Sequence, residues 1–546
     1  MAGDIEQRHK YSTALIFALF FAVLLALHAP LLHLPYFWDE AGYYVPAARD
    51  LLLTGTLIPH STPSNAHPPL VMAYLALAWK VLGYTPGVTR TALLAVAAFS
   101  LLGVFRLAQR VANTEVAVAS AICTALYPVF FAQSSLAHLD LAAAGLTFWG
   151  LLAYVENRRW AIAIWFSVAV LAKETAILAP VALFGWELLS SFLHKNALVS
   201  PSIRRRPKSL RLLIPLLPLA LWYSFHYTRT GFVFGNPEFF RYNVRATVQP
   251  LRVLLALGLR LWQVVGYLNF YFLSLAAMLA MWLRPLQDHG EERQRISLDV
   301  QFSFLAVVAV YVVAMAVVGG AVLARYMLPA IPLVIIVLVS TLRRRVRLWR
   351  GVIAIVVLAF VAGLFVNPPY GFSIEDNLAY RDYVSLHQQA ENFVEARYPM
   401  ARVLTAWPAS DELSHPYLGY VTRPVRVFRV EDFTVEQMMA AADLRSDFEI
   451  ALVFSTKYEP PHSWFERRRT WERWKTRFFG YHRDVPPAVA AQILGGRLVY
   501  NDFRKGQWVS VIEMEQVEEA RVQSQRTSED ARPSPKSLDL NNHCWE

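Results

Sequence analysis

Two neighbouring carboxylates, Asp39 and Glu40, stand where charged groups are costly. They lie in the stretch 36–44 (YFWDEAGYY), which directly follows the first long apolar run. Tyr and Trp suit the headgroup region of a membrane, whereas an ionisable residue beside hydrocarbon is a candidate for function. An ionised carboxylate there can take a proton from an attacking hydroxyl or amine. The ordinary alternative is that both residues cap a juxtamembrane helix in water.

Other polar residues that interrupt or flank apolar runs offer complementary chemistry. Cationic side chains hold phosphates and carboxylates accept protons, a combination that suits a reaction between a membrane-held anionic donor and an acceptor. The candidates for binding a donor phosphate are Lys173, Arg325, Arg241 and Arg245. The other polar candidates for such a site are His67, Asp140, Tyr43, Glu174 and Tyr326.

Several of these residues also have an ordinary structural interpretation. His67 precedes a Pro-Pro pair and can cap a helix, and Asp140 can be the N-cap of the next apolar run. Arg325 and Tyr326 can be interfacial anchors. A site is favoured because all of them fall on the same predicted side of the membrane.

The sequence predicts no definite cofactor. His67 and His138 are far from the spacing of a His-Glu-x-x-His motif, so no metal signature is visible. A divalent cation held by carboxylates beside Asp39 and Asp140 remains an alternative. There is also no phosphate-cradling glycine loop and no nucleophile elbow with a credible triad.

Composition places the chain among polytopic α-helical membrane proteins. Of its 546 residues 55% are hydrophobic and only 17% are charged, too few to coat a soluble globule of this size. The net charge of +11 does not indicate a nucleic-acid partner, because much of it lies in short clusters between apolar runs. About eleven spans are expected, near 11–34, 88–110, 114–133, 139–155, 158–172, 175–194, 210–230, 264–284, 301–320, 326–342 and 350–366.

The short apolar segment from Leu70 to Leu82 decides the orientation of everything that follows. It carries Lys80 and follows a Pro-Pro pair, so we predict a helix lying on the outer surface rather than a span. With the N-terminus inside, every dense basic cluster then falls on the cytoplasmic side. The outer side receives the 35–87 loop, the Ser134–Asp140 turn, the Lys173-Glu174 break, the 231–263 loop and Arg325.

After the last apolar run the sequence becomes a mixture of polar and apolar residues. Residues 1–366 are predicted to form the transmembrane domain, 367–515 a soluble α/β domain on the outer, periplasmic side, and 516–546 a disordered tail. Ala390–Arg397 is typical of the middle of a helix. Strands are expected at Arg402–Ala406, Val425–Val430, Phe448–Ser455 and Gln507–Glu513.

The order of these elements resembles the GT-C glycosyltransferases, in particular the protein O-mannosyltransferase and aminoarabinose lipid A transferase superfamily. The specific motifs are Asp39-Glu40 and His67-Pro68-Pro69-Leu70. Supporting elements are Leu139-Asp140, Ala172-Lys173-Glu174 and Arg325-Tyr326-x-x-Pro329. The resemblance covers residues 1–366. This chain departs from the family at Lys173-Glu174, where Lys-Gly is usual.

The resemblance implies a hexosyl- or pentosyltransferase that uses a polyprenyl-phosphate-linked sugar. Asp39 would be the base of a single inverting displacement, with Glu40 beside it orienting the acceptor or an ion. Lys173 and Arg325 would hold the donor phosphate, with Arg241 or Arg245 as further candidates. Asp140 would shape the sugar or acceptor pocket. The acceptor would be a lipid, a glycan or a protein, and the expected location is the bacterial inner membrane.

Two other classes of protein have ionisable residues beside apolar runs. A multispan transporter or lipid flippase would place ionisable residues near the bilayer midplane, with broken helices in paired halves. Here the charges are predicted at one rim and the halves are not alike, which favours the enzyme. The third class is a membrane-anchored binding protein that works through residues 367–546.

Overall fold

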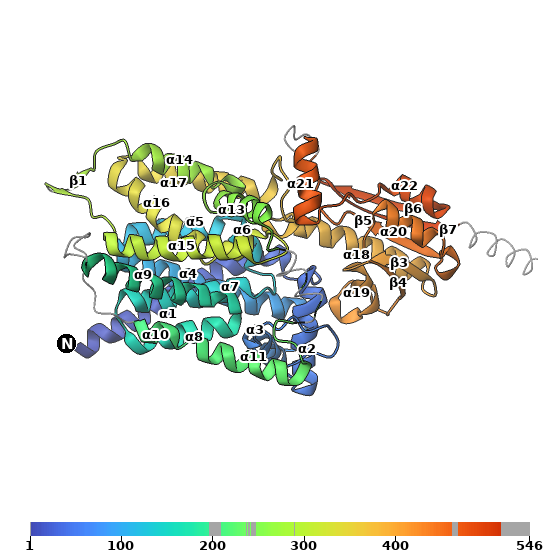
Figure 1. The fold of residues 1–546 in the computed structure, drawn as a ribbon, viewed down its shortest axis with the longest axis horizontal. Coiled ribbons are helices and arrows are strands. Elements are labelled where there is room, and N and C mark those ends of the chain that lie inside the picture. Colours follow the sequence, from blue (N-terminus) through green and yellow to red (C-terminus); the bar gives the residue numbers. More distant parts are fainter. Residues whose placement is uncertain are drawn as a thin grey trace, which may run out of the picture.

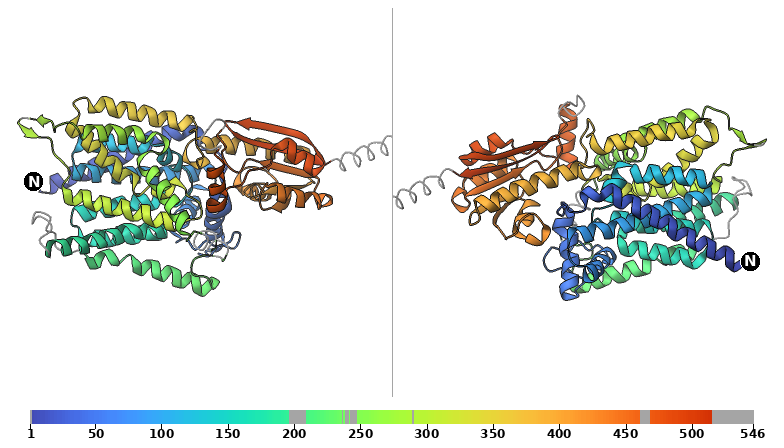
Figure 2. Two further views of the ribbon diagram at one scale, coloured as in Figure 1. Left: turned by 45° about the horizontal axis from the view of Figure 1, so that its top comes forward. Right: turned by 180° about the vertical axis from the view of Figure 1, so that it is seen from behind.

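The structure is a computed structural model, and it describes residues 2–195, 209–235, 237, 241, 247–288, 290–460 and 468–514. Two parts follow one another along its long axis (Figure 1 and Figure 2). One part is a bundle of helices, and the other is a smaller part built on a β-sheet. The long helix α18 (Ala379–Arg397) opens the second part.

Apolar helices form the bundle, as expected for an integral membrane protein. Within the described ranges, length and composition make five segments long and apolar enough to cross a membrane: Thr13–Leu31, Pro86–Val111, Glu174–Leu193, Pro250–Asn269 and Leu298–Val317. The helices of the bundle are α1 (Ala2–His28), α4 (Pro86–Val111), α5 (Thr114–Leu126), α6 (Pro128–Gln133), α7 (Asp140–Val155), α8 (Arg159–Ala172), α9 (Leu178–Lys195), α10 (Ser209–Leu213), α11 (Leu216–Thr230), α13 (Pro250–Val265), α14 (Tyr271–Ala280), α15 (Leu298–Val317), α16 (Ile331–Arg345) and α17 (Trp349–Phe365).

Two of the expected spans are interrupted. The run 114–133 divides into α5 and α6 at Pro128, because proline has no backbone N–H to continue a helix and disfavours helical geometry in the residue before it. The run 264–284 is broken between Gly266 and Phe270. There Leu268 and Asn269 take positive φ angles of 46° and 69°.

The expectation of an outer loop over 231–263 is wrong for its last part, which is helix α13. The two arginines of this helix, Arg252 and Arg260, have buried side chains. Arg252 donates to the Gly319 carbonyl at 2.7 Å, and Arg260 donates to the Leu323 carbonyl at 2.6 Å. Because the connection after α15 accepts these hydrogen bonds, an apolar helix can carry both residues.

The segment Leu70–Leu82 is helix α3, with the bounds that the sequence predicts. At 1.5 Å per residue its length is about 20 Å, well short of a hydrocarbon core about 30 Å thick. Together with α2 (Val45–Thr54) it lies near the end of the bundle that faces the sheet (Figure 1).

The N-terminus and basic connections lie at the far end of the bundle, away from the sheet (Figure 1). There Arg343 pairs with Glu115 at 2.6 Å. Arg344 pairs at 2.5 Å with Glu292 of β2 (Glu291–Glu292), which forms a hairpin with β1 (Gln287–Asp288). This separation of basic loops from the sheet part agrees with the orientation that the positive-inside rule predicts.

The second part contains a five-stranded mixed sheet in the order β4-β3-β5-β7-β6. β3 pairs in parallel with β4 and β5, whereas β7 is antiparallel to β5 and β6. The elements are β3 (Arg402–Ala406), β4 (Arg426–Val430), β5 (Ile450–Phe454), β6 (Gly496–Arg504), β7 (Gln507–Met514), α19 (Ala409–Ser414), α20 (Val435–Ala442), α21 (Arg469–Phe479) and α22 (Pro487–Leu494).

Four strands lie where the sequence predicts them, and β6 is the strand it misses. β6 is an edge strand that contains Asn501-Asp502, so it lacks the apolar run of a central strand. It joins β7 through Lys505-Gly506, whose positive φ angles of 47° and 84° suit a tight hairpin turn. The predicted tail 516–546 lies outside the described residues.

Candidate active site

A cavity of about 850 Å³ opens where the bundle meets the sheet part. Seven of the residues singled out in the sequence line it: Asp39, Tyr43, His67, Lys173, Glu174, Arg325 and Tyr326. The segment after α17 and the sheet part add Glu375, Trp407, Thr456 and Lys457. Candidates that are far apart in the sequence therefore share one space.

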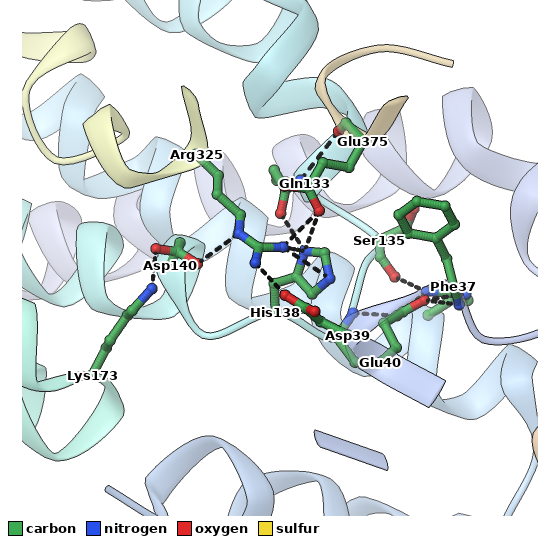
Figure 3. Close-up of polar contacts among 12 residues, drawn as sticks. Phe37, Asp39, Glu40, Gln133, Ser135, His138, Asp140, Lys173, Arg325 and Glu375 are labelled. Atoms are coloured by element: carbon green, nitrogen blue, oxygen red, sulfur yellow. Dashed lines mark hydrogen bonds and ion pairs between the residues drawn. The ribbon is translucent and has the colours of Figure 1, made fainter. Parts of the chain in front are cut away.

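Arg325 lies at the centre of the site, in the short 3₁₀ helix η7 (Ala324–Met327). Figure 3 shows its guanidinium between three carboxylates from distant parts of the chain. Nη1 donates to Glu375 Oε2 at 2.6 Å, Nη2 donates to Asp39, and Nε lies 3.4 Å from Asp140 Oδ2. Because the Arg325 side chain is only 2% exposed, its charge depends on these carboxyl groups for compensation.

Lys173 pairs with the other carboxylate oxygen of Asp140. Its Nζ donates to Asp140 Oδ1 at 2.6 Å and lies 4.4 Å from the ring centre of Tyr326. Lys173 stands between α8 and η3 (Glu174–Ile177) with extended backbone angles, so the helix break turns its side chain into the protein. A lysine ammonium has three N–H donors, and the pair with Asp140 uses one of them.

His67 and Glu174 bring two sequence motifs into contact. His67 Nδ1 lies 2.8 Å from Glu174 Oε2. The residue before His67, Ala66, has a positive φ of 59°, and its carbonyl accepts a hydrogen bond from Trp222 at 2.8 Å. Glu174, which replaces the glycine usual in the resembling family, thus fixes the His67 imidazole at the cavity wall.

Glu40 does not line the cavity but anchors the loop that carries Asp39. Its carboxylate is completely buried and forms a bidentate ion pair with Arg90. Figure 3 shows the position of the carboxylate. It also accepts hydrogen bonds from the backbone N–H groups of Phe37, at 2.7 Å, and Ala137. These contacts fix the chain on both sides of Asp39.

An aromatic wall closes the cavity on the side of the sheet part. The Trp407 ring lies 5.3 Å from the Trp38 ring and 5.8 Å from the Tyr43 ring, centre to centre. A Cβ atom on Gly42 would lie 2.6 Å from Trp407. Glycine is therefore required at position 42 for this close approach.

The remaining candidates are placed differently. Asp140 lies behind the cavity wall, where it joins Lys173 to Arg325. Arg241 is exposed and is not among the lining residues, and Arg245 falls outside the described residues. Asp39 and Asp140, considered above for a divalent cation, pair with cationic side chains.

Glu375 is a site residue that sequence reasoning misses, and the buried Asp376 stands next to it in the chain. They follow the last span, in a stretch predicted only as the start of a soluble domain. Burial raises the pKa of Glu375 to about 8 and that of Asp376 to about 7. Asp376 accepts a hydrogen bond from the Tyr267 hydroxyl at 2.6 Å. The available signal was the pair of adjacent acids beside an apolar run, the same pattern as Asp39-Glu40.

Known proteins support a specific class for this fold. Residues 66–223 match the family described as dolichyl-phosphate-mannose-protein mannosyltransferase. The crystal structure of ArnT from Cupriavidus metallidurans bound to undecaprenyl phosphate is similar, with a TM-score of 0.54 and 13% identity, covering 90% of this chain and 97% of that chain. Its apo form has a TM-score of 0.53 and 14% identity, with the same coverage. A search of curated protein sequences finds no match.

The structural likeness shows a GT-C fold, and the family match names the same class of enzyme, a membrane glycosyltransferase. Within that class, the chain is similar to ArnT along nearly its whole length and to the mannosyltransferase family over residues 66–223. The GT-C resemblance inferred from the sequence motifs is confirmed.

The anchoring role of Glu40 can be tested through Arg90. Arg90→Met leaves a buried carboxylate without its cation, so we expect the free energy of unfolding to fall by about 3–5 kcal/mol. Thermal unfolding of the purified protein in detergent measures the loss. Arg158→Met is the control, because Arg158 is 70% exposed in its pair with Glu156 and should cost less than about 1 kcal/mol. Equal stability of the two variants would contradict this role.

The raised pKa of Glu375 predicts a pH-dependent stability. Between its ordinary pKa of 4.5 and about 8, the unfolded chain loses this proton while the folded protein keeps it, so stability falls as the pH rises. The stability of Glu375→Gln relative to wild type should therefore grow over this range and level off above it. Unfolding measured across this range tests this, with the exposed Glu436→Gln as control. A difference that stays constant over this range would show that Glu375 is already ionised in the folded protein.

Proposed function

We propose that this protein transfers a sugar from a polyprenyl-phosphate donor to an acceptor at the end of the bundle that carries the sheet part. The observation that carries the proposal is the position of Asp39, in a cavity shared with Lys173 and Arg325. The cavity is large enough for a sugar and part of an acceptor. The ArnT structure similar to this chain holds undecaprenyl phosphate, a ligand of the same chemistry.

Asp39 is the general base in this proposal. Its carboxylate takes the proton of an acceptor hydroxyl or amine as that group attacks the anomeric carbon. The bond between the anomeric carbon and the phosphate oxygen breaks, and the lipid phosphate leaves with the electron pair. A single displacement of this kind inverts the anomeric configuration. The ion pair with Arg325 holds the Asp39 carboxylate in position for the attack.

Lys173 is the main contact for the donor phosphate. The guanidinium of Arg325 is shared by three carboxylates, whereas the Lys173 ammonium keeps donors beyond its bond to Asp140. The leaving phosphate stays charged and needs cations rather than a proton. We therefore assign Arg325 to positioning the carboxylates. Its part in binding the donor phosphate is smaller than the family resemblance implies. Lys457 is a further cation on the opposite wall.

The acceptor is proposed to enter beside His67, Glu174 and Tyr43, in front of Trp407. The basic connections at the opposite end favour an orientation in which the sheet part lies outside the cytoplasm, in the periplasm of a bacterial cell. The acceptor class is a lipid, a glycan or a protein.

Asp39→Asn tests the base. Because Asn cannot accept the acceptor's proton, the rate of sugar transfer should fall by about 10²–10⁴-fold while the protein stays folded. Mass spectrometry of the polyprenyl-phosphate sugar consumed in a membrane extract measures the rate. Asp443→Asn, at an exposed position of the sheet part, is the control. Wild-type turnover by Asp39→Asn would remove Asp39 from the mechanism.

Lys173→Met tests the phosphate contact. Loss of a charged hydrogen bond is worth about 1.5–3 kcal/mol, so affinity for the donor should fall by about 10–100-fold. Binding of undecaprenyl phosphate to the purified protein measures this without turnover. Lys80→Met, exposed on α3, should bind as wild type does. Unchanged binding by Lys173→Met would show that another cation holds the phosphate.

A further inference from the structure

Three titratable side chains meet inside the sheet part, away from the cavity described above. His387 and Glu391 are four residues apart on α18, and Glu412 lies on α19. His387 Nδ1 donates to Glu412 Oε2 at 2.7 Å and lies 3.6 Å from Glu391 Oε1. One potential ligand atom from each residue lies within 4.8 Å of the others. All three side chains are at most 1% exposed.

The cluster lacks the compensation that buried charges need. Among the described residues, no donor group reaches either oxygen of Glu391, and Glu412 Oε1 and His387 Nε2 are likewise without a donor or acceptor. The hydrogen-bonding neighbour of the Glu391 side chain is the carboxyl group of Glu412, a contact that requires a proton on one of the two glutamates. No lysine or arginine in the described ranges pairs with either carboxylate. Two buried carboxylates without a cation are strongly unfavourable, and one imidazole offsets at most a single charge.

We propose that His387, Glu391 and Glu412 bind a divalent ion of a first-row transition metal. Zn²⁺ is the ion best suited to test for this site. An imidazole nitrogen with carboxylate oxygens is a donor set that Zn²⁺ accepts. Ligands at about 2.1 Å from a tetrahedral ion lie about 3.4 Å from one another. His387 Nδ1 lies 3.6 Å from Glu391 Oε1 and 2.7 Å from Glu412 Oε2, so the Glu412 carboxylate would move back slightly to admit the ion. The ion takes the place of the proton on His387 Nδ1 and leaves a fourth position open. This proposal is independent of the proposed transferase function.

The position of the cluster indicates what the ion does. The Tyr383 ring stacks on the His387 ring at 4.0 Å and lies 5.6 Å from the ring of Trp38, beside Asp39. Glu412 belongs to α19, which begins two residues after Trp407 of the cavity wall. An ion bound to both helices would hold the two sides of this aromatic wall together. The role is structural, since the cluster does not line the cavity.

Metal content of the full-length protein in detergent tests the proposal. The chain carries a tag without histidines, and His543 and Cys544 are changed to Ala and Ser so that these tail residues cannot bind the ion. After loading with Zn²⁺ and removal of excess metal, we expect about one ion per chain and a higher unfolding temperature than in the chelator-treated protein. A protein that retains no Zn²⁺ and shows no such shift would overturn the proposal.

Glu391→Gln separates an ion from a proton shared between the two glutamates. If an ion binds, this variant loses the Zn²⁺ and its thermal shift, whereas Glu436→Gln keeps both. If the glutamates share a proton instead, the amide can donate to Glu412. The variant is then as stable as wild type or more so, and wild type holds no metal, which contradicts the proposal. If Glu391→Gln does not fold, Zn²⁺ content and unfolding temperature are measured on His387→Gln instead.

Discussion

The site depends on one buried guanidinium. Arg325 is surrounded by Asp39, Asp140 and Glu375, which come from the first loop, the start of α7 and the segment after α17. Removal of one partner from a buried ion cluster weakens the compensation of the charges that remain. The same contacts that stabilise the junction of the two parts therefore fix the position of the proposed base. Stability and the proposed function are coupled here because they use the same atoms.

The hydrogen-bond capacity of each cation decides its role. A guanidinium has five N–H donors in a rigid plane, which suits contact with several carboxylates at once. A lysine ammonium is a compact charge on a flexible stem and can accept a new partner with little rearrangement. This difference explains why Arg325 serves as an organiser and Lys173 as the phosphate contact in the proposed reaction. Glu40 and Asp140 do not line the cavity themselves. They hold in place residues that do line it.

Much of the site was predictable from the sequence, because polar residues beside apolar runs are rare and carry information. Asp39, Lys173, His67 and Arg325 were found in this way. Glu375 was not, because a carboxylate in a mixed polar stretch looks like solvent-exposed surface. Helix α13 was missed for a different reason: its buried arginines donate hydrogen bonds to backbone carbonyls that no sequence pattern reveals. β6 was missed because an edge strand needs only one apolar face.

The junction has a consequence for biosynthesis. Asp39 belongs to the first loop, whereas Trp407 and Lys457 of the opposite wall emerge from the ribosome only after every helix of the bundle. The cavity is therefore incomplete until the last third of the chain has been translated and has docked. A nascent protein paused after α17 would therefore hold Asp39 in a half-built cavity that lacks the Trp407 ring and the Lys457 cation.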